Sequence, residues 1–297
     1  MNNYPRARYR LLFTNPADGA TNMAIDEALL LSVAAGESPP TLRFFAWTPP
    51  CLSLGYAQPV EDVDLHRLAA SGFGLVRRPT GGRAILHTDE LTYSIITPQT
   101  DPRVAGGIVE SYRRLSEGLV RGLARLGAKT RNDRVFTAEN AERKERERER
   151  EKEKEGSALS ANSAVKDNPV CFVSPSKYEI TANGKKLIGS AQARKRGVVL
   201  QHGSLPLTGD IARICDVLIY ADEAARRAAK EQVRARATTL ESALARAVSW
   251  QEAAEAMKEG FAETLTLDLE PAPLTEEEMA KAKETPYFVF ASFAPLR

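Results

Sequence analysis

The chain has 297 residues, 43% hydrophobic and 27% charged, and a formal net charge of +2, which argues against nucleic acid as its main partner. Three cysteines, an odd number, argue against a disulfide framework, and no apolar run approaches the roughly 20 residues of a membrane span. We therefore expect a globular protein with no signal peptide, working in the reducing cytoplasm.

The first part of the chain alternates helices with short strands. Apolar residues recur every four positions over residues 21–34, which predicts a helix. A stripe of tyrosine and leucine predicts a second, amphipathic helix over 111–126. Between them, apolar runs that end at Pro or Gly predict strands at 42–47, 51–54, 73–77, 84–86 and 91–96.

A highly charged segment interrupts this pattern. Residues 142–155 are fourteen consecutive charged residues, seven acidic and seven basic. Such a segment has too little apolar surface to offset the entropy lost on ordering. We interpret residues 137–168 as a solvated helix or a disordered insertion without chemistry of its own.

Order is predicted again from Val170 onward. Asn183-Gly184 lies between two short segments, 177–181 and 185–188, and predicts a β-hairpin in which these segments are the strands. Another strand is expected at 198–201, and the chain beyond residue 207 is alanine-rich and helical.

Two capping boxes, which begin at Ser249 and Thr275, predict the starts of the last two helices. Strands mixed with helices, several joined by hairpins, predict an α+β fold with a mixed sheet. We divide the chain into a catalytic domain, 1–266, and a C-terminal helix and tail, 267–297. The apolar end, 287–294, is interpreted as an edge strand, a dimer contact or an unpaired segment.

Several common site signatures are missing from the sequence. There is no Walker A loop, no dinucleotide-binding glycine pattern after a strand and no Gly-x-Ser-x-Gly elbow. None of the three histidines, His66, His87 and His202, pairs with cysteine at a metal-site spacing. A metal at His87 and Asp89 is the less favoured alternative, so we predict metal-free chemistry.

Three segments remain as candidates for a site. In the first, Gly81 and Gly82 follow a strand, where they form either a plain tight turn or a loop whose amides bind a carbonyl or phosphate oxygen. In the second, Lys186 lies on the return strand of the hairpin, where an exposed surface lysine is the simpler interpretation.

The third candidate is Cys171. Cys51 and Cys215 have apolar neighbours, as structural cysteines do, whereas Cys171 lies between Pro169 and the polar run that precedes the hairpin. A nearby cation, for which Lys186 is a candidate, would favour the thiolate that a nucleophile requires. A buried, inert cysteine is the competing interpretation.

In combination, these segments resemble a known family. The matching pieces occur in one order along the chain, at residues 22–28, 77–87, 90–94, 171–179, 186–192 and 200–204. They resemble the biotin/lipoate protein ligase superfamily, and within it the octanoyl-acyl carrier protein:protein N-octanoyltransferases of the LipM type. The resemblance implies a biotin/lipoate ligase-like catalytic domain: a mixed β-sheet with packed helices, here with the charged insertion just before Cys171.

The resemblance also implies a role for individual residues. Cys171 matches the family's acyl-accepting cysteine, and Lys186 matches the lysine that contacts the acyl carbonyl. The remaining matches line the acyl pocket, and they are Arg78, Thr80, Gly81, Gly82, His87, Ser190, Gln192, His202 and Gly203.

The chemistry that the resemblance implies is octanoyl transfer. Octanoyl-acyl carrier protein would acylate Cys171, and a lysine of a lipoyl-domain protein, such as glycine cleavage H protein or a 2-oxoacid dehydrogenase E2, would take the acyl group. No cofactor is expected. The alternative is an ATP- and Mg-dependent lipoate ligase, although ligases of this fold tend to carry Ser-Gly-Gly-Gly where this chain has Thr80-Gly-Gly-Arg83, and they do not need Cys171.

Overall fold

The computed structural model describes residues 4–133, 170, 179–285 and 287. The predicted charged insertion, residues 171–178 with Cys171, and most of the apolar end lie outside the described residues. No helix within the described ranges is long and apolar enough to cross a membrane.

The centre of the fold is an eight-stranded mixed sheet, with strand order β11-β1-β2-β6-β10-β9-β8-β7. Pairing is parallel for β11-β1-β2 and antiparallel from β2 onward. The α+β class with a mixed sheet is confirmed. The strands are β1 (Ala7–Phe13), β2 (Thr41–Phe45), β6 (Glu90–Pro98), β7 (Thr130–Asp133), β8 (Glu179–Ala182), β9 (Lys185–Lys195), β10 (Val198–Pro206) and β11 (Leu267–Pro271).

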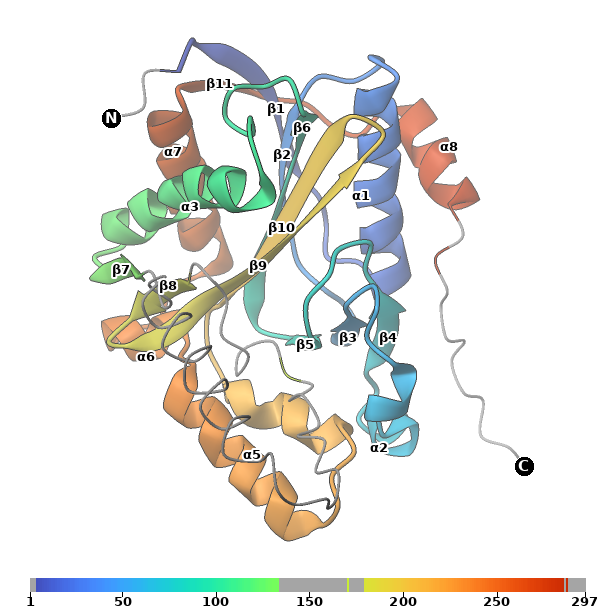
Figure 1. Ribbon diagram of the computed structural model, residues 1–297, viewed down its shortest axis with the longest axis vertical. Helices are drawn as coiled ribbons and strands as arrows, with labels where there is room; N and C mark the ends of the chain where they lie inside the picture. Colours follow the sequence, from blue (N-terminus) through green and yellow to red (C-terminus); the bar gives the residue numbers. More distant parts are fainter. Residues whose placement is uncertain (1–3, 134–169, 171–178, 286, 288–297) are drawn as a thin grey trace, which may run out of the picture.

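Helices cover both faces of this sheet (Figure 1). On one face, α3 (Ile108–Arg125) packs against α7 (Trp250–Leu265), and both contribute to the largest apolar core. On the other face, α1 (Gly19–Ala34) contacts β6 and β10 and is covered in turn by α8 (Glu276–Glu284). Strand side chains therefore alternate between two buried faces.

A second, three-stranded sheet lies below α1, with the order β4-β3-β5. Its strands are β3 (Cys51–Leu54), β4 (Gly74–Arg77) and β5 (Ile85–His87). A separate apolar core joins it to the flanking helices. These are η1 (Val60–Asp62), α2 (Leu65–Ala70), η2 (Ile211–Val217) and α5 (Glu223–Arg236), with α6 (Leu240–Leu244) following along the chain.

The predicted hairpin is confirmed within the described residues. Strands β8 and β9 pair antiparallel around Asn183 and Gly184, whose φ angles are 52° and 76°. Two successive residues with positive φ are the signature of a type I′ turn, which Asn-Gly adopts more readily than other dipeptides.

The predictions for the next two strands were too short. Strand β9 does not end at Ile188 but continues to Lys195. Strand β10 does not stop at Gln201 but continues through His202 and Gly203 to Pro206. Glycine is needed at position 203, because a Cβ there would stand 2.4 Å from Ser190 Oγ on β9. Close strand packing, and not a turn, therefore explains this glycine.

The two predicted capping boxes have different outcomes. At Thr275 both reciprocal hydrogen bonds with Glu278 are present. At Ser249 the hydroxyl accepts the Glu252 N–H, but the Glu252 carboxylate pairs with Arg246 instead of returning to the cap. An exposed arginine within reach offers the carboxylate a stronger, charge-assisted partner than a backbone amide.

The described part of the C-terminal segment packs on the rest of the chain. Strand β11 extends the large sheet beside β1. The sequence did not predict β11. Glu278 of α8 is 1% exposed and forms a bidentate ion pair with Arg10 of β1, with both oxygen–nitrogen distances below 3 Å. Tyr287 donates a hydrogen bond to Glu27 of α1 at 3.0 Å.

The α3–α7 contact provides a test of this packing. Gly260 of α7 lies so close to α3 that a Cβ would be 2.4 Å from the Gly118 carbonyl oxygen. We predict that Gly260→Ala lowers the free energy of unfolding by about 1–3 kcal/mol, because two helix backbones must separate. Denaturant unfolding measures it, and exposed Glu255→Ala on the same helix should stay within about 0.5 kcal/mol. An equal effect of both changes would contradict the packing argument.

Candidate active site

A cavity lies where the large sheet, the small sheet and α1 meet. Apolar groups and a few converging polar side chains form its wall, the combination typical of a binding site for a small, largely apolar group. The lining residues are Met23, Trp47, Ser53, Arg78, Ile85, His87, Thr92, Gly189, Ala191, His202, Gly203 and Ser204.

The loop of residues 78–83, called here the glycine loop, connects β4 toward β5 beside this cavity. Arg78 is buried, and its guanidinium donates to the carbonyl oxygens of Gly81 at 2.9 Å and Arg83 at 2.7 Å. The same group donates to the Ser53 carbonyl oxygen at 3.0 Å. These hydrogen bonds from Arg78 therefore stabilise the curved conformation of the loop.

The peptide groups of the glycine loop are oriented by these contacts. The Thr80 carbonyl accepts the Tyr56 N–H at 2.9 Å, and the Gly81 carbonyl accepts from Arg78. In a planar trans peptide the next N–H points away from the carbonyl. The N–H groups of Gly81 and Gly82 therefore face away from these partners, and neither has an acceptor among the described residues. Whether these amides bind a ligand oxygen or belong to a plain tight turn stays a prediction.

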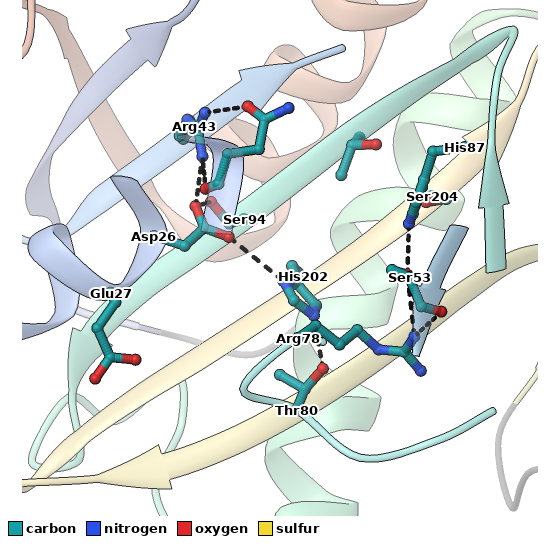
Figure 2. A network of polar contacts seen from close by, with 12 residues as sticks. Asp26, Glu27, Arg43, Ser53, Arg78, Thr80, His87, Ser94, His202 and Ser204 are labelled. Carbon is teal, nitrogen blue, oxygen red and sulfur yellow. Dashed lines mark hydrogen bonds and ion pairs between the residues drawn. The ribbon is translucent and has the colours of Figure 1, made fainter. Parts of the chain in front are cut away.

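His202 connects the glycine loop to α1. Its Nε2 lies 2.6 Å from the Thr80 hydroxyl, and its Nδ1 lies 3.4 Å from an Asp26 oxygen (Figure 2). Burial lowers the pKa of His202 below its ordinary value of 6.5, although the Asp26 carboxylate acts in the opposite direction. The imidazole is therefore neutral at physiological pH.

Asp26 belongs to a fully buried ion pair. Its carboxylate lies 2.7 Å from Arg43 of β2, and both side chains are 0% exposed. Ser94 of β6 also donates to Asp26, at 2.9 Å. Burial alone would raise the pKa of Asp26, but the Arg43 guanidinium and His202 outweigh it and hold that pKa below its ordinary value of 3.8.

His87 is held by a second set of contacts. Its Nδ1 lies 2.6 Å from Glu90, its Nε2 lies 2.7 Å from the Ser53 hydroxyl, and Arg78 donates to that hydroxyl at 3.1 Å. The imidazole also stacks on Trp47, with ring centroids 3.9 Å apart. His87 is thus fixed in the cavity wall. Across the described ranges, no group of three His, Cys, Asp or Glu side chains is arranged to hold a metal ion.

Ser190 and Gln192 lie on the other face of the large sheet. The Ser190 hydroxyl contacts Tyr93 at 2.9 Å, and Gln192 accepts from Ser111 of α3 at 3.1 Å. The cavity wall at β9 consists instead of the alternate residues Gly189 and Ala191. A role for Ser190 and Gln192 in substrate binding stays a prediction.

Lys186 is not the exposed hairpin lysine of the simpler interpretation, since it is 5% exposed. Its ammonium lies 3.1 Å from Glu179, which is itself largely buried. Cys171 lies outside the described residues. Val170, the residue before it in the sequence, pairs with Ala84 at the end of the glycine loop.

The other two cysteines behave as structural residues. Cys51 is 1% exposed and Cys215 is 0% exposed. Burial raises the pKa of the Cys51 thiol to about 12, and it also raises the pKa of Cys215. Neither thiol is suited to act as a nucleophile at neutral pH.

Several side chains of the site were not predicted. Asp26, Glu90 and Glu179 are the carboxylates that hold His202, His87 and Lys186. For Asp26 a signal was available, because it lies among the apolar positions of a helix, where a charge requires a buried partner. Glu90 lies only three residues after its partner His87, and Glu179 meets Lys186 on the neighbouring strand of the hairpin, but no spacing rule in the sequence marks either pair.

Comparison with known proteins identifies the family. The family model described as lipoyl protein ligase A/B catalytic domain matches residues 18–262. The chain therefore belongs to that family, and the superfamily predicted from the sequence is confirmed.

Curated relatives within this family indicate the type of reaction. An octanoyltransferase LipM of Kyrpidia tusciae is 44% identical over 93% of this chain and 94% of that protein. That of Moorella thermoacetica is 42% identical, over 94% of each chain, and that of Staphylococcus aureus is 37% identical, over 93% and 94%. The chain is an acyltransferase, as the sequence predicted.

Solved structures share the fold. One is a bipartite lipoate protein ligase of Thermoplasma acidophilum, from a study of an archaeal lipoylation system with its E2 lipoyl domain. Its TM-score is 0.72 and its sequence identity 25%, and the match covers 94% of this chain and 92% of that one. A lipoate-protein ligase A bound with ATP has a TM-score of 0.68 and 26% identity, covering 93% of each chain.

The two loop glycines should respond differently to substitution. A Cβ at Gly81 would enter open space, so Gly81→Ala should change the unfolding free energy by no more than about 0.5 kcal/mol. It should nevertheless lower the acyl-transfer rate at least tenfold, because the methyl group stands beside the amide pair. Gly82 has a φ of 94°, so Gly82→Ala should cost about 1–3 kcal/mol of stability. Thermal unfolding and transfer rates check both, and an unchanged rate in Gly81→Ala would count against ligand binding at the loop.

Proposed function

We propose that this acyltransferase moves an octanoyl group from octanoyl-acyl carrier protein to a lysine of a lipoyl-domain protein, with Cys171 as the nucleophile. The proposal extends to this chain the substrate that the names of its octanoyltransferase relatives state. Glycine cleavage H protein and a 2-oxoacid dehydrogenase E2 are the acceptors we propose, and the cytoplasm is the proposed location.

The observation that carries the proposal is the position of the residues that flank Cys171 in the sequence. Val170 is 1% exposed and pairs with Ala84, where the glycine loop ends. Glu179, at the other end of the segment, forms an ion pair with Lys186. The described residues on either side of Cys171 therefore contact the end of the glycine loop and a buried ammonium.

The reaction would proceed in two balanced steps. The Cys171 thiolate attacks the thioester carbonyl of the donor, and the carrier leaves as a thiolate that takes up a proton. The acceptor's lysine, as a free amine, then attacks the enzyme thioester; the C–S bond breaks, an amide forms, the nitrogen releases one proton to solvent, and the Cys171 thiolate is regenerated. Splitting the transfer lets two bulky carrier proteins use one face in turn.

No cofactor is needed in this scheme. Exchange of one thioester for another is close to thermoneutral, and conversion of a thioester to an amide is downhill, so ATP is not required. Both steps develop negative charge on the carbonyl oxygen. The ammonium of Lys186 and the loop amides are the donors that we assign to it, and loss of one such donor typically costs about 10²–10³ in rate.

The second candidate is an ATP-dependent ligase, favoured by the fold shared with a lipoate-protein ligase bound with ATP. The transferase is preferred, since the relatives at 37–44% identity are octanoyltransferases, whereas the ligase structures are 25–26% identical.

The acyl-enzyme is the direct test. Purified protein mixed with octanoyl-acyl carrier protein should gain the mass of one octanoyl group, and Cys171→Ala should gain none, because the accepting sulfur is absent. Cys51→Ala is the matched control and should still be acylated, since that thiol is buried. Intact-mass spectrometry gives the readout. Full transfer by Cys171→Ala, or transfer only with ATP, would establish the ligase instead.

Glu179 should be needed to hold the Lys186 ammonium. We predict that Glu179→Gln lowers kcat about tenfold or more, because a buried ammonium loses the carboxylate that fixes its position. Lys185→Ala is the control, since Lys185 is the adjacent residue and donates outward to the Arg234 carbonyl. Single-turnover acylation of Cys171 separates this effect from substrate binding. Equal rates for the two variants would remove Glu179 from the mechanism.

A further inference from the structure

Half of the residues that line the cavity have polar side chains. These six are Ser53, Arg78, His87, Thr92, His202 and Ser204. A buried polar group without a hydrogen bond costs free energy, so each of these side chains requires a partner. The choice of partner decides whether the wall offers hydrogen bonds to a bound chain or keeps them within the protein.

Glu90 is the partner of three of these side chains, although it does not itself line the cavity. Its Oε1 accepts from the Thr92 hydroxyl at 2.5 Å and from the Ser204 hydroxyl at 2.8 Å. The same oxygen lies 2.6 Å from His87 Nδ1, and the other ring nitrogen lies 2.7 Å from the Ser53 hydroxyl (Figure 2). A carboxylate can only accept, so all three groups direct a proton toward Glu90.

The other polar groups of the wall are also engaged by the protein. The Trp47 indole N–H donates to the Thr92 hydroxyl at 2.8 Å, so this hydroxyl accepts one hydrogen bond and donates another. Arg78 and His202 are bound to the glycine loop. The wall therefore turns its polar atoms toward one another and presents mainly carbon to the cavity.

We propose that Glu90 is a specificity-determining residue, which makes the cavity take acyl chains without oxygen substituents and reject chains that carry a hydroxyl or keto group. Because Glu90 accepts from Thr92 and Ser204, neither hydroxyl donates into the cavity. An oxygen on the chain loses its hydrogen bonds to water and finds no donor on this side of the wall. This inference rests on the proposed function, since it concerns the acyl group that is transferred.

The expected size of the effect follows from the loss of hydrogen bonds. A chain oxygen that enters the cavity leaves water, where it accepts hydrogen bonds, for a wall whose donors are already used. The O–H of the chain can still donate to a remaining lone pair of a wall hydroxyl, so only part of its hydrogen bonding is lost. A pocket of this kind rejects a chain that adds one hydroxyl by about 10–100-fold.

The first experiment compares two acyl chains of equal length. Octanoyl and 7-hydroxyheptanoyl have the same number of non-hydrogen atoms, and differ only in a terminal methyl group against a terminal hydroxyl. With each chain on the acyl carrier protein, kcat/KM of wild type should be about 10–100-fold higher for octanoyl. Heptanoyl and 6-hydroxyhexanoyl repeat the comparison with the hydroxyl one carbon nearer the carbonyl. Equal values within both pairs would overturn the proposal.

Ser204→Ala tests the role of Glu90. The change removes one hydroxyl that donates to Glu90 and leaves space for one oxygen, so the hydroxyl of a bound chain can donate to the carboxylate instead. The preference for the unsubstituted chain should fall at least about fivefold in one of the two pairs. Ser116→Ala, which removes a 0% exposed hydroxyl that donates to the Tyr112 carbonyl within α3, should keep the wild-type preference. An unchanged preference in Ser204→Ala would overturn the proposal.

A binding measurement separates the specificity from the reaction. The chain has two tryptophans, Trp47 and Trp250, so the fluorescence of Trp250→Phe reports only Trp47 in the cavity wall. Octanoic acid should bind about 10–100-fold more tightly than 7-hydroxyheptanoic acid. Equal binding of the two acids, or no binding of octanoic acid, would overturn the proposal. Preferential binding of octanoic acid without octanoyl transfer by wild type would overturn only the proposed function.

Discussion

The arrangement of the site depends on the buried ion pair between Asp26 and Arg43. Asp26 lies on α1, and its carboxylate reaches Arg43 of β2, Ser94 of β6 and His202 of β10, three neighbouring strands of the large sheet. Two charges removed from water are tolerated only when hydrogen bonds satisfy both, and removal of one partner leaves the other uncompensated. The pair therefore fixes where α1 crosses the sheet, and with it one wall of the cavity.

The glycine loop is held in place through its carbonyl groups. The Arg78 guanidinium binds the carbonyl groups of Gly81 and Arg83, and the Thr80 hydroxyl links the loop to His202 of β10. Because every peptide group is rigid, fixing the carbonyls also fixes the amides that face the opposite way. Such preorganised donors lose no orientational freedom when charge develops on a substrate oxygen, which is how amide sites lower a reaction barrier.

The shared fold explains how transferases and ligases can use one scaffold. Fold does not fix function, which depends on the chemistry of the groups placed at the site. A cavity for an acyl chain and a loop that binds an acyl oxygen serve either reaction. What distinguishes them is the source of the energy, which is an existing thioester when a cysteine accepts the acyl group and ATP when an adenylate must first be made.

The sequence by itself determined the α+β class, the Asn183-Gly184 hairpin, the buried character of Cys51 and Cys215, and the family, because each follows from local periodicity, turn chemistry or an ordered set of motifs. Tertiary structure alone decided that Lys186 is buried on Glu179, that Ser190 and Gln192 turn away from the cavity, and that Asp26 reaches His202 across 176 positions. Those contacts depend on strand register and on which helix covers which face, which pairings distant in sequence establish.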